Sequence, residues 1–290
     1  MAITVPEIDW FDPTILQGQL DGGYAGVRER VRDLLSRPEF EPVHWLATAD
    51  YRERVLDWCK QLADEGLSTY GFPKEYGGEE DPGATVAMFE TLALGDISLL
   101  IKFGVQFGLW GGAVVHLGTS VHHERYLRAI MSLELPGCFA MTETGHGSNV
   151  QQLATTATYD PGAEEFVIDT PAEHARKEFI GNAACHGRMA AVFAQLIVGG
   201  ERHGVHALVV PLRDDEDRLL PGIEIEDCGQ KLGLNGVDNG MIWFRKVRVP
   251  RDALLNRYGN VTPEGEYESP IKDPNKRFFT MLGTLVQGRV

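Results

Sequence analysis

The segment from Cys138 to Asn149, CFAMTETGHGSN, holds the densest group of residues whose types and spacing could do chemistry. An apolar run meets a polar loop there, and Gly145 and Gly147 let backbone N–H groups approach a flat or anionic ligand. Thr142 and Ser148 place short hydroxyl groups beside them. The pattern indicates a ligand-binding loop at the end of a strand. A sharp surface turn is the alternative, because Gly, Ser and Asn are ordinary turn formers.

The net charge of the chain is strongly negative, since 27 Lys and Arg stand against 42 Asp and Glu and give −15. Such a surface repels nucleic acid and anionic membranes, so no nucleic-acid partner is expected. No stretch of roughly 18 uninterrupted apolar residues appears, and no membrane span is expected. With 290 residues, 43% of them hydrophobic, the chain can bury a core and is expected to form two compact units.

The cysteines are scattered without a Cys-x-x-Cys pair, which argues against both a disulfide framework and a zinc site. The N-terminus lacks a basic stretch followed by an apolar one, as a secretory signal would have. The last residues, QGRV, are not a peroxisomal address. These features together predict a cytoplasmic protein.

Helical periodicity runs from Tyr24 to about Met131. One apolar helix face is formed by Tyr51, Val55, Trp58 and Leu62. Asp50 and Glu53 are expected to cap this helix, and Gly66 to end it. Further helices are expected over residues 85–94, 99–117 and 119–131. This region is therefore predicted to be a helical bundle.

After Pro136 the pattern changes to short runs rich in β-branched and aromatic residues, separated by turn residues. Strands are expected over residues 154–159 and 165–169 around a turn, 190–198 and 205–211 around Gly199-Gly200, and 241–249. A small antiparallel β-barrel or sandwich would hide the edges of so many strands. Asp273 before Pro274 is a plausible helix start, and a helix is expected over residues 277–290.

The predicted fold class is therefore α+β. An N-terminal α-helical bundle, residues 1–135, precedes the small antiparallel β-barrel or sandwich, residues 136–265. Residues 266–290 are expected to begin a C-terminal helical domain.

Four segments, in this order, resemble the acyl-CoA oxidase and acyl-CoA dehydrogenase superfamily of flavoproteins. They are GFPKEYGG at 71–78, MTETGHGSNV at 141–150, KEFIGN at 177–182, and KLGLNGVDNG at 231–240 followed by VRVPRD at 247–252. The resemblance runs from about Tyr51 to the last residue. It implies FAD as cofactor, acyl-CoA as substrate, a homo-oligomer, and a C-terminal helical region that is truncated here.

The resemblance also implies an activity and a site. Family members oxidise acyl-CoA to trans-2-enoyl-CoA in fatty acid β-oxidation: a carboxylate base takes the α proton and the flavin takes the β hydrogen as hydride. Met141 and Thr142 match one flavin contact, and Phe179 and Gly181 match a second. Gly147 and Ser148 match the part that faces CoA. As alternatives, Thr142 caps its own backbone, and Ser148 merely closes the turn.

The electron acceptor depends on Gly181. Dehydrogenases of the family usually carry Thr after Trp in this segment, whereas the oxidases have Gly as this chain does. A missing side chain beside the flavin would leave room for dioxygen, so an oxidase that uses O2 is predicted. A dehydrogenase that passes electrons to an electron-transfer flavoprotein is the alternative. The glycine can also mark a strand bulge.

No catalytic residue is assigned within the chain. Glu143 is interpreted as structural rather than as the base. Arg289 matches an Arg of the family's first C-terminal helix, and one subgroup, the isovaleryl-CoA dehydrogenases, carries its catalytic Glu just before it. Gly288 stands there, so the base is expected in a later C-terminal region. A non-catalytic module that binds FAD or acyl-CoA is the second hypothesis.

Other chemistries fit less well. Ser148 lacks the Gly-x-Ser-x-Gly pattern of a hydrolase. His116, His122 and His123 do not converge on one helix face as metal ligands would, so no metal is predicted. No P-loop or dinucleotide fingerprint follows a strand, which argues against a nicotinamide cofactor. Asn235-Gly236 and Asn239-Gly240 are interpreted as turns.

Overall fold

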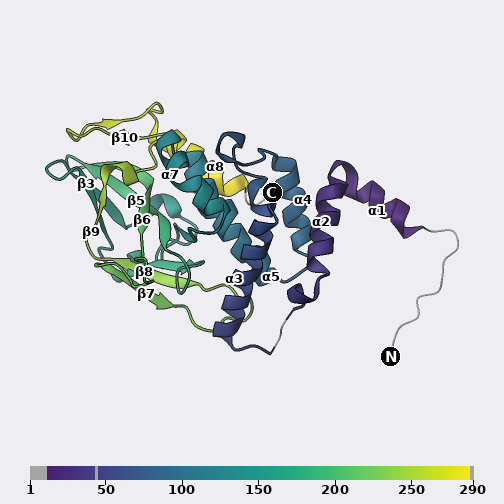
Figure 1. Ribbon diagram of the computed structural model, residues 1–290. Helices are drawn as coiled ribbons and strands as arrows, with labels where there is room; N and C mark the ends of the chain where they lie inside the picture. Colours follow the sequence, from purple (N-terminus) through teal and green to yellow (C-terminus); the bar gives the residue numbers. More distant parts are fainter. Residues whose placement is uncertain (1–11, 43–44, 288–290) are drawn as a thin grey trace.

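The computed structural model describes residues 12–42 and 45–287. Helices occupy one side of the molecule and strands the other, and the final helix returns to lie against the helical side (Figure 1). The helices are α1 (Pro13–Asp21), α2 (Ala25–Leu35), α3 (Thr48–Asp64), α4 (Pro82–Leu92), α5 (Ile97–Phe103), α6 (Gly111–Leu117), α7 (Ser120–Met131) and α8 (Pro274–Gln287). A helical region followed by a sheet domain is thus confirmed.

Helix α3 buries the predicted apolar face, with Val55, Trp58 and Leu62 fully inside the core. Its predicted cap is wrong. The helix begins at Thr48, so Asp50 lies within the first turn, where its charge suits the helix dipole. Gly66 does end the helix, because its φ of +80° is a left-handed conformation that favours glycine.

Residues 97–117 form one long helix that is interrupted by a π-helical segment, Gly104–Trp110, between α5 and α6. Within the described part of the chain this helix alone is long and apolar enough to cross a membrane, but 56% of its most apolar stretch is buried in the fold. It packs as a core helix. Gln106, in the π segment, accepts a hydrogen bond from the N–H of Gly137 (2.9 Å) and so joins this helix to the first strand.

The strands are β1 (Gly137–Ala140), β2 (Thr156–Asp160), β3 (Glu165–Asp169), β4 (Lys177–Ile180), β5 (Met189–Val198), β6 (Glu201–Pro211), β7 (Ile223–Asp227), β8 (Gly240–Phe244), β9 (Val247–Pro250), β10 (Asn260–Val261) and β11 (Tyr267–Glu268). The hairpins β2–β3 and β5–β6 form as predicted, each antiparallel across its expected turn. The predicted N-cap of α8 is also confirmed, since Asp273 accepts the N–H of Asn275.

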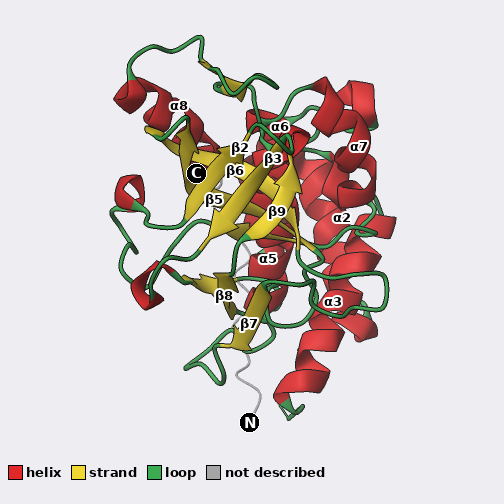
Figure 2. Ribbon diagram, turned by 90° about the vertical axis from the view of Figure 1, so that its left-hand side faces the viewer, coloured by secondary structure: helices red, strands yellow, loops and turns green. Residues whose placement is uncertain are grey.

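The larger sheet is mixed, not purely antiparallel as predicted. Its order is β1-β5-β2-β3-β9, with β6 on β5, and a second sheet has the order β4-β8-β7. Figure 2 shows the two sheets, with β5, β3 and β9 in the larger one and β8 and β7 in the smaller. Strands β1 and β2 both run parallel to β5: Gly137 pairs with Met189, and Thr156 with Gln195. The intervening loop carries the chain forward along β5 instead of reversing it, and no local turn signal marks such a pairing.

The single strand predicted over residues 241–249 is wrong, because it is two strands in different sheets. Lys246 has a φ of +53° and breaks the run between β8 and β9. Its N–H donates to the Asp169 carboxylate at 3.2 Å, which replaces the lost strand pairing. Strands β4 and β7 were not predicted, since both are short and carry charged residues.

Strand β5 is the shared wall of two hydrophobic cores. Ala191 and Phe193 pack into the core that the helices form, whereas Val192 and Leu196 pack into the core of the strand region. Nearly every residue of β5 is therefore buried, which explains its uninterrupted apolar sequence.

Gly137 stands where the helical core meets β1, and we expect Gly137→Ala to lower the free energy of unfolding. An added Cβ would lie 2.3 Å from Nε1 of Trp110, a buried ring that cannot withdraw. Overpacking of this kind costs roughly 1 to 2 kcal/mol. Urea unfolding measures it, with Gly26→Ala as the control, since a Cβ there meets no atom of the described residues within 4 Å. Equal midpoints for both variants would contradict the prediction.

Candidate functional site

The end of β1 and the strand β4 lie side by side. The N–H of Glu178 donates to the carbonyl of Thr142 (3.1 Å), and the Thr142 hydroxyl donates to the carbonyl of Glu178 (2.9 Å). Gly181 follows Glu178 by three residues, just past the end of β4, so it lies at most about 10 Å from Glu178. The alternative that Thr142 caps its own backbone is wrong, because its hydroxyl bonds to the neighbouring strand.

A fully buried ion pair holds the loop after β1. The Lys177 ammonium lies 3.0 Å from Oε1 of Glu143 and also donates to the carbonyls of Met141 (3.0 Å) and Phe193 (2.6 Å). The two carboxylate oxygens of Glu143 accept the N–H groups at positions 154 and 155 as well. Both carboxylate oxygens are therefore engaged, which agrees with the structural role predicted for Glu143.

The two charges of this pair depend on each other. Burial acts to raise the pKa of Glu143, but the Lys177 ammonium and the amide donors outweigh it, so the pKa lies below its ordinary value. Burial lowers the pKa of Lys177 to about 8, with Glu143 opposing that change. Both groups are therefore charged near pH 7, and Glu143 is a poor proton acceptor.

The loop that follows contains a tight turn and an open glycine. The N–H of His146 donates to the carbonyl of Glu143 (3.0 Å), which closes the turn. Gly145 packs against His174, whose carbonyl would lie 3.1 Å from an added Cβ. By contrast, a Cβ at Gly147 would meet no atom of the described residues within 4 Å, and Ser148 is exposed like Gly147. The loop therefore contains both a tight turn and a surface that a ligand could reach, so the two interpretations of this loop do not exclude each other.

Strand β4 contains a bulge at Phe179. The register with β8 shifts between Lys177 and Ile180, and Phe179 has a φ of +56° with 63% of its surface exposed. Gly181 lies against the π-helical segment: an added Cβ would be 2.8 Å from Cγ2 of Val105. The bulge thus lies at Phe179 and not at Gly181, and the glycine has a packing reason of its own.

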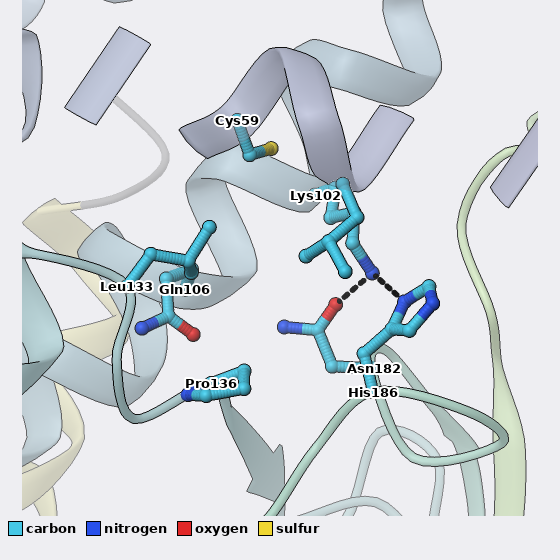
Figure 3. A pocket seen from close by; sticks show the side chains of 8 residues that line it. Cys59, Lys102, Gln106, Leu133, Pro136, Asn182 and His186 are labelled. Carbon is cyan, nitrogen blue, oxygen red and sulfur yellow. Dashed lines mark hydrogen bonds between the residues drawn. The ribbon is translucent and has the colours of Figure 1, made fainter. Parts of the chain in front are cut away.

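A buried polar network behind Gly181 was missed from the sequence. The Lys102 ammonium contacts Oδ1 of Asn182 (2.8 Å) and Nδ1 of His186 (2.9 Å) (Figure 3). It also contacts Oδ1 of Asp238 (2.5 Å). Asp238 belongs to the motif KLGLNGVDNG, which sequence reasoning interpreted as turns. The one available signal was a lone lysine in an otherwise apolar helix, Ile97–Leu117.

Metal ligands are not grouped in this structure: across residues 12–42 and 45–287, no set of three or more His, Cys, Asp or Glu side chains could hold a metal ion. Two of the histidines considered above serve the fold. His122 bonds to the carbonyl of Asp252, and His123 bonds to the carbonyls of Val114 and Val115.

Two protein-family models match most of this chain. The acyl-CoA dehydrogenase N-terminal domain matches residues 25–134, and the acyl-CoA dehydrogenase middle domain matches residues 138–247. The chain belongs to the acyl-CoA oxidase and acyl-CoA dehydrogenase superfamily. The resemblance seen in its motifs is confirmed, and both the helical region and the paired ends of β1 and β4 fall within the matched parts.

Within this superfamily the chain is similar to acyl-CoA oxidases. Acyl-coenzyme A oxidase 2, peroxisomal, from Arabidopsis thaliana is 47% identical over 278 residues, which are 93% of this chain and 40% of that protein. The crystal structure of acyl-CoA oxidase 1 from Yarrowia lipolytica matches with a TM-score of 0.84 at 30% identity, over 96% of this chain and 39% of that one. Acyl-CoA oxidase-1 of Caenorhabditis elegans, complexed with FAD and ATP, matches with a TM-score of 0.74 at 30% identity, over 90% and 39% of the two chains.

The chain therefore spans about two fifths of the length of these oxidases. The cytoplasmic location predicted above is wrong by this comparison, because the Arabidopsis relative is named as peroxisomal. A peroxisomal address is a C-terminal tripeptide of the whole polypeptide, so the residues QGRV do not bear on it. Gly288 and Arg289, discussed above for the position of the base, lie outside the described residues.

Proposed function

We propose that this chain forms the flavin- and acyl-CoA-binding part of an FAD-dependent acyl-CoA oxidase, which converts acyl-CoA to trans-2-enoyl-CoA with O2 as acceptor. The observation that carries the proposal is the pairing of Thr142 with Glu178. It brings the two family flavin positions, Thr142 and Gly181, onto neighbouring strand ends. The similarity to acyl-CoA oxidases, one of them described with FAD, supports it.

The residues present fit a planar ring. Phe179 offers an exposed aromatic face on its bulge, and Gly181 beside it adds no side chain. The Thr142 hydroxyl gives its hydrogen to Glu178, which leaves its oxygen free to accept a hydrogen bond. We assign Met141, Thr142, Phe179 and Gly181 to the flavin, and bound FAD would supply the hydride acceptor for the β hydrogen.

The accessible loop at Gly147 and Ser148 is assigned to the CoA part of the substrate. Exposed backbone without a side chain and a short hydroxyl group suit a polar, anionic ligand. No base is assigned within the chain: Glu143 is buried, and both of its carboxylate oxygens already hold partners within the fold. The division at residues 135 and 265 and the homo-oligomeric state remain predictions.

Thr142→Val should weaken FAD binding about five- to tenfold, because one hydrogen bond to a ligand contributes about 1 kcal/mol and 1.4 kcal/mol corresponds to a factor of ten. Fluorescence quenching of FAD by the full-length protein measures the dissociation constant. The control is Thr144→Val in the same loop, whose hydroxyl is exposed and bonds to the Glu178 carboxylate instead. Equal weakening in both variants would indicate a general loop effect and contradict the assignment.

The activity itself is tested on the full-length protein loaded with FAD. Addition of acyl-CoA without oxygen should bleach the flavin absorption, and admission of air should restore it with release of hydrogen peroxide. Bleaching followed by reoxidation only with an electron-transfer flavoprotein would identify a dehydrogenase. No bleaching with acyl-CoA of any chain length would leave a non-catalytic module and overturn the proposal.

A further inference from the structure

The network around Lys102 has no evident role in binding acyl-CoA or flavin directly. Lys102 is 2% exposed and Asp238 is 0% exposed. The crevice that Lys102 lines with Cys59, Gln106 and its other neighbours has a free volume of about 0 Å³, so no ligand fits there (Figure 3). A buried ammonium is costly unless it is paired, which raises the question of what this pair holds in place.

The partners of Lys102 belong to two other segments of the chain. Lys102 lies on α5, Asp238 precedes β8, and Asn182 and His186 lie in the loop between β4 and β5. The second carboxylate oxygen of Asp238 accepts the N–H groups of Cys185 (2.9 Å) and His186 (3.0 Å). One ion pair therefore ties the core helix to the loop that directly follows Gly181.

Asn182 links Lys102 to β1 through two hydrogen bonds. Its Oδ1 accepts from Lys102, while its Nδ2 donates to the carbonyl of Gly137 at 2.9 Å, at the start of β1. Gln106, one turn along the same helix, accepts the N–H of Gly137 at 2.9 Å. The strand that ends at Thr142 and the segment that contains Gly181 are thus both attached to the helix through Lys102 and Gln106.

We propose that Lys102, together with Asp238, is a positioning residue, and this proposal rests on the flavin assignment of the proposed function. Lys102 sets the spacing between the β1 end at Thr142 and the segment at Gly181, which together form the flavin-facing edge. Its action passes through Asn182 and does not involve contact with flavin or substrate. A residue of this kind controls a site by restricting the groups that touch the ligand.

The test compares three variants of the full-length protein. Lys102→Met with Asp238→Asn removes both charges of the pair together, so no uncompensated charge stays buried. Asn182→Gly keeps the ion pair and removes the side chain that joins Lys102 to the Gly137 carbonyl; glycine suits the φ of +67° at that position. The control, Arg52→Met with Asp227→Asn, removes another ion pair between a helix and the strand region. Among the described residues, Arg52 also contacts the Cys185 thiol, and neither side chain bonds to β1.

Two readouts separate positioning from general stability. Amide hydrogen exchange of the protein without FAD should accelerate about tenfold in residues 137–142 of both test variants, because local opening sets these rates. The dissociation constant of FAD should rise about tenfold in the same variants, the size expected when a supporting contact is lost. The control should change neither quantity by more than about twofold, even if its melting temperature falls.

Unchanged exchange in residues 137–142 for both test variants would overturn the positioning role, as would an acceleration spread evenly over the whole chain. If the double variant does not fold, Asn182→Gly still decides, since it preserves the buried pair. FAD binding by the unsubstituted protein distinguishes failure of the proposed function from failure of the positioning role. Failure of that protein to bind FAD would overturn the proposed function, whereas normal FAD binding in all variants would overturn the role of Lys102 alone.

Discussion

Lys177→Met should lower the free energy of unfolding by about 3 to 5 kcal/mol, because it leaves the Glu143 carboxylate buried without its partner. Lys177 also satisfies the carbonyls of Met141 and Phe193. Its loss therefore removes the side-chain hydrogen bonds that join β4 to the β1 end and to β5, next to the positions assigned to FAD. We expect weaker FAD binding along with the lower stability.

Urea unfolding measures the stability of the Lys177 variant, and two further variants are compared with it. Lys177→Met with Glu143→Gln removes both charges and should recover most of the loss, as expected for a buried pair. Arg248→Met removes an exposed ion pair with Glu165 and should leave the unfolding midpoint unchanged. A single Lys177 variant as stable as the parent protein would contradict the importance of the buried pair.

Gly181→Thr introduces the residue that dehydrogenases of the family usually carry, and we expect it to disturb the site. A Cβ at this position lies 2.8 Å from Cγ2 of Val105, a β-branched side chain that cannot turn aside freely. The stability should fall by roughly 1 to 3 kcal/mol, and FAD affinity should fall at least tenfold as β4 moves away from the π-helical segment.

A second substitution tests the cause. Val105→Ala in the Gly181→Thr background opens space on the helix and should restore most of the melting temperature and of the FAD affinity. If instead Gly181→Thr alone keeps both at parental values but slows reoxidation of the flavin by O2, the glycine serves dioxygen access and the packing explanation is wrong. Stopped-flow reoxidation of the reduced protein measures that rate.

Some features could be predicted because adjacent residues determine them. The hairpin between β2 and β3 follows from its turn residues, and α7 begins at Ser120 directly after Thr119, as expected from the residue types there. The residues assigned to flavin and substrate were predicted from the resemblance of their motifs to the superfamily, because no local physical pattern identifies them. Their assignment stays a prediction, although the structure does place Thr142 beside the segment that contains Gly181.

By itself, the sequence determined the order of helical and strand regions, the main hairpins and helix ends, and the family, since each depends on residue patterns within short windows. Only the tertiary structure decided that β1 runs parallel to β5, that Lys102 reaches Asp238 136 residues away, and that Val105 presses on Gly181. Contacts of that kind join segments that are far apart in the sequence, and neither segment alone indicates its partner. They form only when burial of the shared core brings those segments together.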